Sequence, residues 1–371
     1  MTGACDDDGS RRIRVLIADD SAVMRSLLRM VFDTKSSIEV VGAASNGLAA
    51  LAEFDRLRPD LVLLDIEMPG MNGLEVLSGI RQRDRRVPVV MCSTLTWRGA
   101  EITLEALARG ASDYVTKPSA QKGFREGVGE LARELIPKIL ALFSAQTATV
   151  RNPTPMAAVD LRRAAAPARI PPARVVVMGV STGGPSALEA VLTKIPATFP
   201  LPILIVQHMP QLFTGLLAER LSSLCSLRVR EAVSGIRPES GVVDIARGDW
   251  HMELSRDFRI GLNQNEPENF CRPSVDALFR SAASATAGRL LGIILTGMGS
   301  DGLAGCRAVR SAGGTVFAQD SATSVIWGMP GAVVGAGLAN KILPLDAIAS
   351  EMERYVAAGT ANATKTEAAA L

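Results

Sequence analysis

Residues 175–184 read VVVMGVSTGG, an apolar run that ends in a serine surrounded by glycines. Two further apolar runs end near polar residues: ILIVQ at 203–207 precedes His208, and LLGIILTG at 290–297 lies shortly before Asp301. Short β-branched runs of this kind are typical of buried strands in a parallel sheet. Because the carboxyl ends of parallel strands share one edge of the sheet, where ligands bind, we expect the serine, the histidine and the aspartate to lie close together.

The three polar residues at these strand ends, Ser181, His208 and Asp301, are the parts of an activated-serine hydrolase. Glycines beside Ser181 permit a tight turn and a close approach of substrate. Backbone N–H groups at the start of the following helix favour an anion such as a tetrahedral oxyanion. The string GVSTG also matches the nucleophile elbow of α/β-hydrolases, but those enzymes follow the order serine, acid, histidine, whereas here the order serine, histidine, aspartate uses three strand ends.

Each member of this set also has a structural interpretation when it is taken alone. A glycine-rich turn between a strand and a helix often binds phosphate or begins a helix, and a histidine after a strand is often structural. Asp301, in the string GMGSDGL, is also a suitable cap for a helix that begins near Leu303. The hydrolase interpretation therefore depends on the convergence of three strand ends.

The first third of the chain alternates short apolar strands with amphipathic helices, which predicts a doubly wound, flavodoxin-like parallel sheet. Asp19 and Asp20 follow the first strand and Asp65 follows the third; in the strand order 2-1-3-4-5 these strands are neighbours. Three carboxylates at one edge repel each other unless a cation binds them, and an oxygen-only ligand set favours Mg²⁺ over zinc. Lys117 and Ser93, after the fifth and fourth strands, would then contact a phosphoryl group transferred to Asp65.

Residues 13 to about 135 resemble the receiver domain of two-component response regulators. The motifs that carry the resemblance are LIADDS, LVLLDIEMPGMNG, VVMCST and YVTKP, in that order. Any one of these acids alone could be a solvated loop carboxylate or a helix cap, but the resemblance assigns the whole set to one site. The implied roles are phosphoacceptor for Asp65, metal ligands for Asp19, Asp20, Asp65 and the carbonyl of Glu67, phosphoryl contacts for Ser93 and Lys117, and switch aromatic for Tyr114.

Residues 174–357 resemble the catalytic domain of the CheB family, the chemotaxis protein-glutamate methylesterases. The motifs are GVSTGG, VQHMP, FTGLLAERL, GDWHMEL, RPSVDALF, ILTGMGSDG and FAQD, which cover nearly the whole range. One departure is Cys271, before RPSVD, where we expect a more polar or basic residue in enteric relatives. The implied roles are nucleophile for Ser181, general base and then acid for His208, orienting carboxylate for Asp301, oxyanion donors for backbone N–H groups near Thr182 and Met298, and a supporting, site-lining role for His251 and Arg272.

The sequence as a whole predicts an α/β protein with two domains and a linker. A receiver domain spans 12–143, and the segment 144–173, rich in Ala, Pro and Arg, is expected to be an interdomain linker. A catalytic domain with a mostly parallel sheet spans 174–357, and an Ala- and Thr-rich tail at 358–371 is expected to be disordered. The linker arginines lack interleaved aromatic residues, which favours a solvated or domain-docking linker over a nucleic-acid arm.

Composition argues against several classes of protein. The net charge of +2 provides no global field for nucleic acid or a membrane surface. The five cysteines are scattered without C-x-x-C spacing, which does not fit a structural zinc site and agrees with a reducing cytoplasm. The acidic start MTGACDDDGS does not resemble a signal peptide, and no apolar run approaches the roughly 20 residues of a membrane span. We therefore expect a cytoplasmic protein without membrane insertion.

Together these features predict a response regulator with an esterase and amidase output. A chemotaxis histidine kinase would phosphorylate Asp65 with Mg²⁺ at the receiver site, and the output domain would need no cofactor for hydrolysis. Its substrates would be γ-glutamyl methyl esters, and also glutamines, of methyl-accepting chemoreceptors, at whose clusters we expect the protein to be recruited. We also expect the unphosphorylated receiver to shield the catalytic edge. Two alternatives remain open: a serine esterase for another substrate, and a non-catalytic adaptor or DNA-binding regulator, against which the lack of a helix-turn-helix pattern argues.

Overall fold

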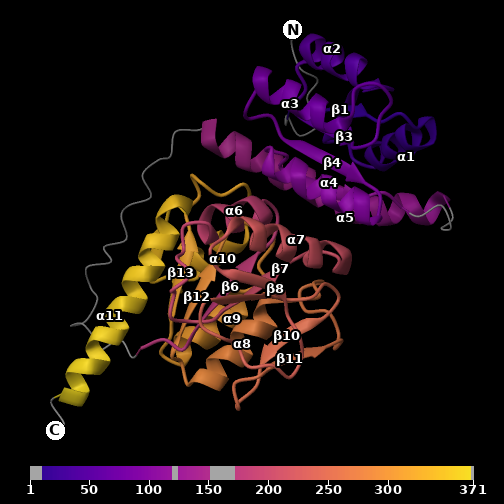
Figure 1. Ribbon diagram of the computed structural model, residues 1–371. Helices are drawn as coiled ribbons and strands as arrows, with labels where there is room; N and C mark the ends of the chain where they lie inside the picture. The colour runs from indigo at the N-terminus through magenta and orange to yellow at the C-terminus, as the bar shows by residue number, and fades with distance from the viewer. Residues whose placement is uncertain (1–10, 119–123, 151–171, 369–371) are drawn as a thin grey trace. The chain divides into compact units, whose positions relative to one another are not determined.

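A computed structural model of the protein describes residues 11–118, 124–150 and 172–368. The chain divides into two compact units, with the boundary between Val150 and Arg151. Each unit contains its own parallel sheet with helices packed around it (Figure 1). The predicted fold class, two α/β units, is confirmed. Across the described ranges, none of the helices has both the length and the apolar character that crossing a bilayer requires.

The first unit contains a five-stranded sheet in the order β2-β1-β3-β4-β5, in which all neighbouring strands are parallel. This is the predicted doubly wound order, and it places β1 beside β3. The elements are β1 (Ile13–Ala18), α1 (Ala22–Asp33), β2 (Ile38–Ala44), α2 (Gly47–Leu57), β3 (Leu61–Asp65), α3 (Gly73–Arg83), β4 (Val89–Ser93), α4 (Trp97–Ala108), β5 (Asp113–Thr116) and α5 (Phe124–Val150).

Local sequence explains where the helices of the first unit begin. Each of α1 to α4 follows a polar residue whose side-chain oxygen accepts a hydrogen bond from a backbone N–H in the first turn. In α3, Glu75 also accepts a hydrogen bond from the N–H of the capping Asn72, which completes a capping box. These caps end the loops that follow the strands, and so they help to position the acidic residues there. The four caps are Ser21, Asn46, Asn72 and Thr96.

The second unit contains a seven-stranded sheet in the order β14-β13-β12-β6-β7-β9-β8, with all neighbouring pairs parallel. The central strands β12, β6 and β7 are buried at every residue. Because they pair in parallel, the residues that follow them lie at one edge of the sheet. A separate antiparallel hairpin, β10–β11, contacts α8. The elements are β6 (Val175–Val180), α6 (Gly184–Leu192), β7 (Ile203–Gln207), α7 (Gln211–Leu224), β8 (Arg228–Glu231), β9 (Val242–Ile245), β10 (His251–Leu254), β11 (Ile260–Asn263), α8 (Val275–Thr286), β12 (Leu290–Ile294), α9 (Leu303–Ser311), β13 (Thr315–Gln319), α10 (Met329–Gly335), β14 (Lys341–Leu343), the 3-10 helix η2 (Leu345–Ala347) and α11 (Ile348–Ala368).

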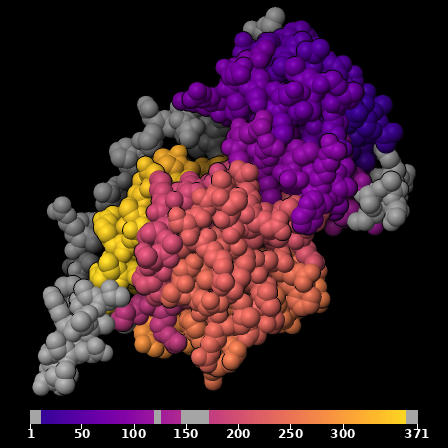
Figure 2. Space-filling view, viewed as in Figure 1, coloured from indigo at the N-terminus to yellow at the C-terminus, as the bar shows by residue number. Residues whose placement is uncertain are grey.

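Two helices extend into segments that we expected to be irregular. Helix α5 continues to Val150, inside the segment 144–173 predicted to be a linker, whose residues 151–171 lie outside the described part of the chain. Helix α11 continues to Ala368, inside the predicted disordered tail at 358–371, and its described portion lies on the surface of the second unit (Figure 2). The physical reason is composition: alanine, the strongest helix former, is frequent in both extensions.

Candidate active site and phosphoacceptor site

Backbone hydrogen bonds hold Ser181 and His208 at one edge of the second sheet. The N–H of Ser181, directly after β6, donates to the carbonyl of Thr296 at 3.0 Å. The N–H of His208, directly after β7, donates to the carbonyl of Val180 at 3.2 Å. Ser181 and His208 therefore follow neighbouring strands, and the backbone of each is tied to the adjacent strand end.

A buried glutamine joins these two strand ends. The side-chain Nε2 of Gln207 donates to the carbonyl of Ser181 at 3.1 Å and to that of His208 at 3.2 Å. Gly184, the first residue of α6, provides the space, because a Cβ at this position would lie 1.9 Å from Oε1 of Gln207. Sequence reasoning missed Gln207. The available signal was a polar side chain at the end of an otherwise apolar strand.

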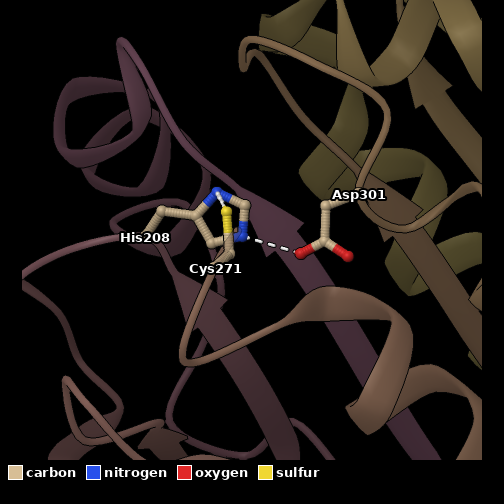
Figure 3. A group of neighbouring side chains, drawn as sticks. All are labelled: His208, Cys271 and Asp301. Atoms are coloured by element: carbon tan, nitrogen blue, oxygen red, sulfur yellow. Dashed lines mark hydrogen bonds and ion pairs between the residues drawn. The ribbon is translucent and has the colours of Figure 1, made fainter. Parts of the chain in front are cut away.

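Asp301 contributes the third side chain. Nε2 of His208 lies 2.8 Å from Oδ2 of Asp301 (Figure 3). Asp301 is buried, with 2% of its surface exposed. Its oxygens also accept hydrogen bonds at the start of α8, from the Val275 N–H at 2.7 Å and from the Ser274 hydroxyl at 2.8 Å. Because the N-terminus of a helix stabilises negative charge, this arrangement holds an ionised carboxylate in one orientation beside the imidazole.

Two residues that sequence reasoning missed support Asp301. The side-chain amide of Asn269 donates to Asp301 Oδ1 at 3.0 Å and to Asp276 Oδ2 at 2.9 Å. The N–H of Asp276 also donates to Asp301 Oδ1, at 3.2 Å. Burial raises the pKa of Asp276, and the nearby charge of Asp301 raises it further. The only sequence signal for Asp276 was its place in the string RPSVDALF.

Burial and hydrogen bonding together set the charge of the histidine–aspartate pair. Burial lowers the pKa of His208, but the hydrogen bonds to Asp301 and Cys271 outweigh it and raise the pKa to about 9. Burial raises the pKa of Asp301, but the hydrogen bond from His208 and those from the start of α8 lower it to about 2. At neutral pH the pair is therefore an imidazolium and a carboxylate, and it must lose a proton before the histidine can act as a base.

The serine side chain is not hydrogen-bonded to this pair. In the ranges that the structure describes, no hydrogen bond joins Ser181 Oγ to His208. Since Nε2 of His208 is bonded to Asp301, the ring nitrogen left for the serine is Nδ1. The Sγ of Cys271 lies 3.7 Å from this same Nδ1 (Figure 3). Cys271 is therefore next to the catalytic candidates, although the sequence marked it only as a departure from a family pattern.

All four residues expected around the site lie in buried or half-buried positions. Thr182 directly follows the serine and is buried, whereas Met298 is half-buried. His251 is buried on β10, where its Nδ1 accepts a hydrogen bond from the Ser274 N–H at 3.2 Å. Its Nε2 lies 3.1 Å from the carbonyl of Glu266. His251 therefore fixes the start of α8 and a neighbouring loop, and its ring is bonded to backbone rather than to the catalytic candidates.

Arg272, the fourth of these residues, contacts Asp249 and the loop that precedes Arg272 in the chain. Its guanidinium pairs with Asp249 at 2.7 Å. It also donates to the carbonyls of Gln264 and Asn265 at 3.1 and 3.0 Å. These contacts anchor the segment that carries Cys271, so the position of Arg272 supports the shape of the site.

In the first unit, two carboxylates and a lysine meet at the edge of the sheet. Nζ of Lys117 lies 2.9 Å from Oδ2 of Asp19 and 2.8 Å from Oδ2 of Asp65. Burial raises the pKa of Asp65, and the hydrogen bond to Lys117 opposes that rise. Burial lowers the pKa of Lys117, but its hydrogen bonds to Asp65 and Asp19 outweigh that effect and raise it. A charged lysine thus faces the carboxylate predicted to accept the phosphoryl group.

The same edge offers ligands for a divalent cation. One carboxylate oxygen from each of Asp19, Asp20 and Asp65 lies within 4.8 Å of the others. Only oxygen atoms are offered by these three side chains, which fits Mg²⁺. The adjoining pocket of about 200 Å³ is lined by Asp20, Asp65, Ile66, Glu67, Cys92, Thr94, Gly99 and Lys117.

Glu67 and Ser93, two further residues of the predicted phosphorylation site, differ in their contacts with Asp65. The Glu67 N–H donates to Asp65 Oδ1 at 3.4 Å, which places the Glu67 backbone next to the carboxylate. The Ser93 hydroxyl donates to the carbonyl of Gly99 at 3.1 Å and accepts a hydrogen bond from Thr103 at 2.8 Å. It therefore faces α4, and a contact with a phosphoryl group would require its side chain to rotate.

Tyr114, the predicted switch aromatic, is buried on β5 with 6% of its surface exposed. Nζ of Lys138, on α5, lies 5.1 Å from the centre of its ring and donates to its carbonyl at 2.6 Å. Burial raises the pKa of Tyr114 well above its ordinary value, so its hydroxyl stays neutral. Its ring is held between β5 and α5 in this structure.

Known families match both units. The family model described as CheB methylesterase matches residues 176–352, and the response regulator receiver domain matches residues 15–128. A protein-glutamate methylesterase/protein-glutamine glutaminase of Trichodesmium erythraeum is 45% identical over 93% of this chain and 99% of its own length. One from a Nocardioides species is 46% identical over 93% of this chain and 96% of its own length. The chain belongs to the CheB methylesterase family.

Two solved structures from Thermotoga maritima resemble one unit each. The CheB methylesterase catalytic domain is 40% identical, covering 49% of this chain and 98% of that chain with a TM-score of 0.48. The response regulator domain of CheB is 43% identical, covering 36% of this chain and 98% of that chain with a TM-score of 0.33.

Membership of the CheB family confirms the resemblance predicted from the sequence motifs. The methylesterase match contains Ser181, His208 and Asp301, and the receiver match contains Asp19 and Asp65. This CheB-family protein is therefore an enzyme of the methylesterase family that carries a response regulator receiver domain. Receiver domains in general bind Mg²⁺ at their phosphorylation site, which agrees with the oxygen ligands on the first sheet.

Proposed function

We propose that this protein is a phosphorylation-regulated chemoreceptor methylesterase. It hydrolyses glutamate methyl esters on methyl-accepting chemotaxis proteins to glutamate and methanol, and it also deamidates receptor glutamines to glutamate. The observation that carries the proposal is the 2.8 Å contact between His208 and Asp301 at the sheet edge where Ser181 directly follows β6. The names of the full-length relatives support the substrate class.

In the first half of the proposed reaction, Ser181 forms an ester with the substrate. Its side chain rotates toward His208, and Oγ attacks the methyl-ester carbonyl while its proton passes to Nδ1 of His208. Asp301 accepts the Nε2–H hydrogen bond and stabilises the imidazolium that forms. The tetrahedral intermediate then collapses: the bond to the methoxy group breaks, and that group takes the proton from Nδ1 and leaves as methanol.

In the second half, water releases the product. His208 removes a proton from a water molecule, whose oxygen attacks the acyl carbonyl of the serine ester. The bond to Ser181 Oγ breaks, Oγ recovers the proton from His208, and glutamate is free. A glutamine substrate follows the same course with ammonia as the first leaving group. Backbone N–H groups near Thr182 and Met298 would stabilise both oxyanions, and removing one such donor typically costs about 10²–10³ in rate.

The receiver would control this chemistry through Asp65. A chemotaxis histidine kinase supplies the phosphoryl group, which the Asp65 carboxylate accepts and Lys117 binds through its ammonium. Asp19, Asp20, Asp65 and the Glu67 carbonyl would hold Mg²⁺, which neutralises charge on the transferring group when it is bound. Phosphorylation is expected to raise the esterase activity. These partners would place the protein in the cytoplasm, at chemoreceptor clusters.

The proposal is tested by methanol release from methyl-esterified receptor membranes, with Mg²⁺ and with or without acetyl phosphate. We expect release that increases with the phosphodonor, disappears in Ser181→Ala and remains in Ser223→Ala, a change at an exposed serine of α7. Release by a folded Ser181→Ala protein would contradict the serine mechanism. Methanol release that does not depend on the phosphodonor would contradict only the proposed regulation by phosphorylation and would leave the esterase assignment in place.

A further inference from the structure

Cys271 is held beside the catalytic histidine by a tight turn. The N–H of Glu268 donates to the Cys271 carbonyl at 3.1 Å, and the N–H of Cys271 donates to the Glu268 carbonyl at 2.8 Å. The two residues between them, Asn269 and Phe270, have positive φ angles of 52° and 62°, as in a two-residue hairpin turn. Asn269 is also bonded to Asp301. The loop that carries the thiol is therefore anchored to the same carboxylate that orients the imidazole.

The position of the thiol relative to the imidazole fits a pair of metal ligands. Sγ of Cys271 lies 3.7 Å from Nδ1 of His208. A zinc ion with ordinary bond lengths, about 2.05 Å to nitrogen and about 2.3 Å to sulfur, at a tetrahedral angle holds these atoms about 3.6 Å apart. The spacing of the two atoms thus matches that of two ligands on one ion.

The hydrogen bond at the other ring nitrogen of His208 also favours metal binding at Nδ1. Nε2 of His208 is hydrogen-bonded to Asp301 Oδ2, which, when the ring is neutral, leaves the lone pair on Nδ1. A histidine whose second nitrogen donates to a carboxylate is the common form of a zinc ligand, because the carboxylate fixes the tautomer and the ring orientation. His208, Cys271 and Asp301 also lie together as a group, with one ligand atom of each within 4.8 Å of the others (Figure 3).

We propose that His208 Nδ1 and Cys271 Sγ form an inhibitory binding site for a soft divalent cation of the zinc type. Nitrogen and thiolate ligands select such ions over Mg²⁺, in contrast to the oxygen-only group of the receiver. On binding, the thiol proton of Cys271 and the Nδ1 proton of the His208 imidazolium pass to solvent, and metal–sulfur and metal–nitrogen bonds form, with water at the remaining positions of the ion. The inhibition rests on the proposed function, because Nδ1 is the atom that would take the proton from Ser181, and a bound ion blocks it.

Binding and inhibition are measured separately on the full-length protein. Binding is followed with Cd²⁺, whose thiolate complex absorbs in the ultraviolet, and inhibition with Zn²⁺ in the methanol-release assay at constant Mg²⁺. The test variants are Cys271→Ser and Cys271→Ala, and the matched control is Cys225→Ser, which removes another half-buried free cysteine at the end of α7. Each variant is compared with its own metal-free rate, and circular dichroism verifies its fold.

The expected results separate this proposal from the proposed function. The wild type and Cys225→Ser should show the Cd²⁺ absorption and the same Zn²⁺ inhibition, while both Cys271 variants lose the absorption and need at least about tenfold more Zn²⁺. A Cd²⁺ absorption that survives in the Cys271 variants, or none in the wild type, would overturn the site. Cd²⁺ absorption that depends on Cys271 in a protein without esterase activity would support the site and count against the proposed function. Equal Zn²⁺ inhibition of all variants would overturn the inhibitory role.

Discussion

The Nε2 atom of His208 lies 2.8 Å from Oδ2 of Asp301, a carboxylate that also accepts hydrogen bonds from the start of α8, from the loop before that helix and from the Gly302 N–H. The aspartate is thereby held by backbone and by short polar side chains, and its exposure to solvent is 2%. An anion fixed in this way keeps the proton on Nε2 when the His208 ring is neutral. The chemistry proposed for Ser181 then has to take place at Nδ1.

Asp301→Asn should remove most of the esterase activity without removing the contact. The amide would donate to Nε2 of His208, which leaves the proton on Nδ1 and removes the base that Ser181 needs. We expect kcat for methanol release to fall by about 10³–10⁴. Thermal unfolding of the variant measures the separate cost of placing an amide among the N–H donors of α8. A folded variant within about tenfold of the wild-type kcat would show that Asp301 does not orient the base.

The rate of methanol release should increase with pH up to an unusually high pH. His208 must be neutral to act as a base, and its pKa is raised to about 9 against the ordinary 6.5, so kcat/KM should increase as pH rises toward about 9. In Asp301→Asn, the residual activity should level off at a lower pH. The measurement is the initial rate of methanol release from about pH 6 to about pH 10, with receptor-free controls for spontaneous hydrolysis. A wild-type rate that is constant above about pH 7 would contradict the expected protonation of His208.

The same pKa shifts predict how stability depends on pH. Because the pKa of His208 is raised, its pairing with Asp301 stabilises the fold fully below about pH 6.5, and this stabilisation is lost as pH rises through about 9. Because the pKa of Asp301 is lowered to about 2 from 3.8, its contribution is present above about pH 3.8 and is lost as pH falls toward 2. Urea unfolding of wild type and Asp301→Asn should therefore differ most between these limits. A difference independent of pH from about 5 to about 10 would refute this linkage.

Asp65 should be the residue that takes up phosphate. With radiolabelled acetyl phosphate and Mg²⁺, we expect label in the wild type and in Asp33→Asn, which alters an exposed carboxylate at the end of α1. Asp65→Asn should remain unlabelled because the amide is not a nucleophile, and EDTA should prevent labelling of the wild type because Asp19, Asp20 and Asp65 would lose their cation. Labelling of Asp65→Asn, or labelling that persists in EDTA, would show that another group accepts the phosphate or that no metal is required.

The strands that position both sites could be predicted from the sequence because each is a short apolar run bounded by turn residues. The apolar run at 203–207 has the same bounds as β7, and the run at 290–297 begins with β12, which ends three residues earlier, at Ile294. The edge strand β8 and the hairpin β10–β11 were harder to predict from the sequence. Strand β8 reads RVRE and buries only Val229, and the hairpin β10–β11 is short and partly polar, so neither contains the continuous apolar run that indicates a central strand.

The sequence alone could identify the polar residues that lie at or shortly after the ends of apolar strands, among them Asp301, seven residues after β12. Ser181 and His208 follow strands that pair in the sheet, and the parallel sheet expected from the apolar runs already placed the ends of these strands at one edge. Gln207, Asn269 and Cys271 could not be assigned in this way, because their contacts depend on the path of loops and on which way a side chain leaves the strand. Cys271 illustrates what the sequence alone could not predict: a turn brings it next to His208, although 63 positions separate the two residues in the chain.

Gly184→Ala should reduce both activity and stability, because the space at this position is occupied by Gln207. A Cβ would lie 1.9 Å from Gln207 Oε1, and the amide of that glutamine holds the carbonyls of Ser181 and His208. We expect a loss of about 1–3 kcal/mol in unfolding free energy and a decrease in kcat on the order of 10- to 10²-fold, since small displacements of catalytic groups are costly.

The matched control is Gly215→Ala, in the interior of α7, where the nearest atom to a new Cβ lies at 4.0 Å and the change should stabilise by about 0.5–1 kcal/mol. Urea unfolding and methanol release measure both effects; a Gly184→Ala protein as active and as stable as the control would mean that Gln207 does not hold the two strand ends in position.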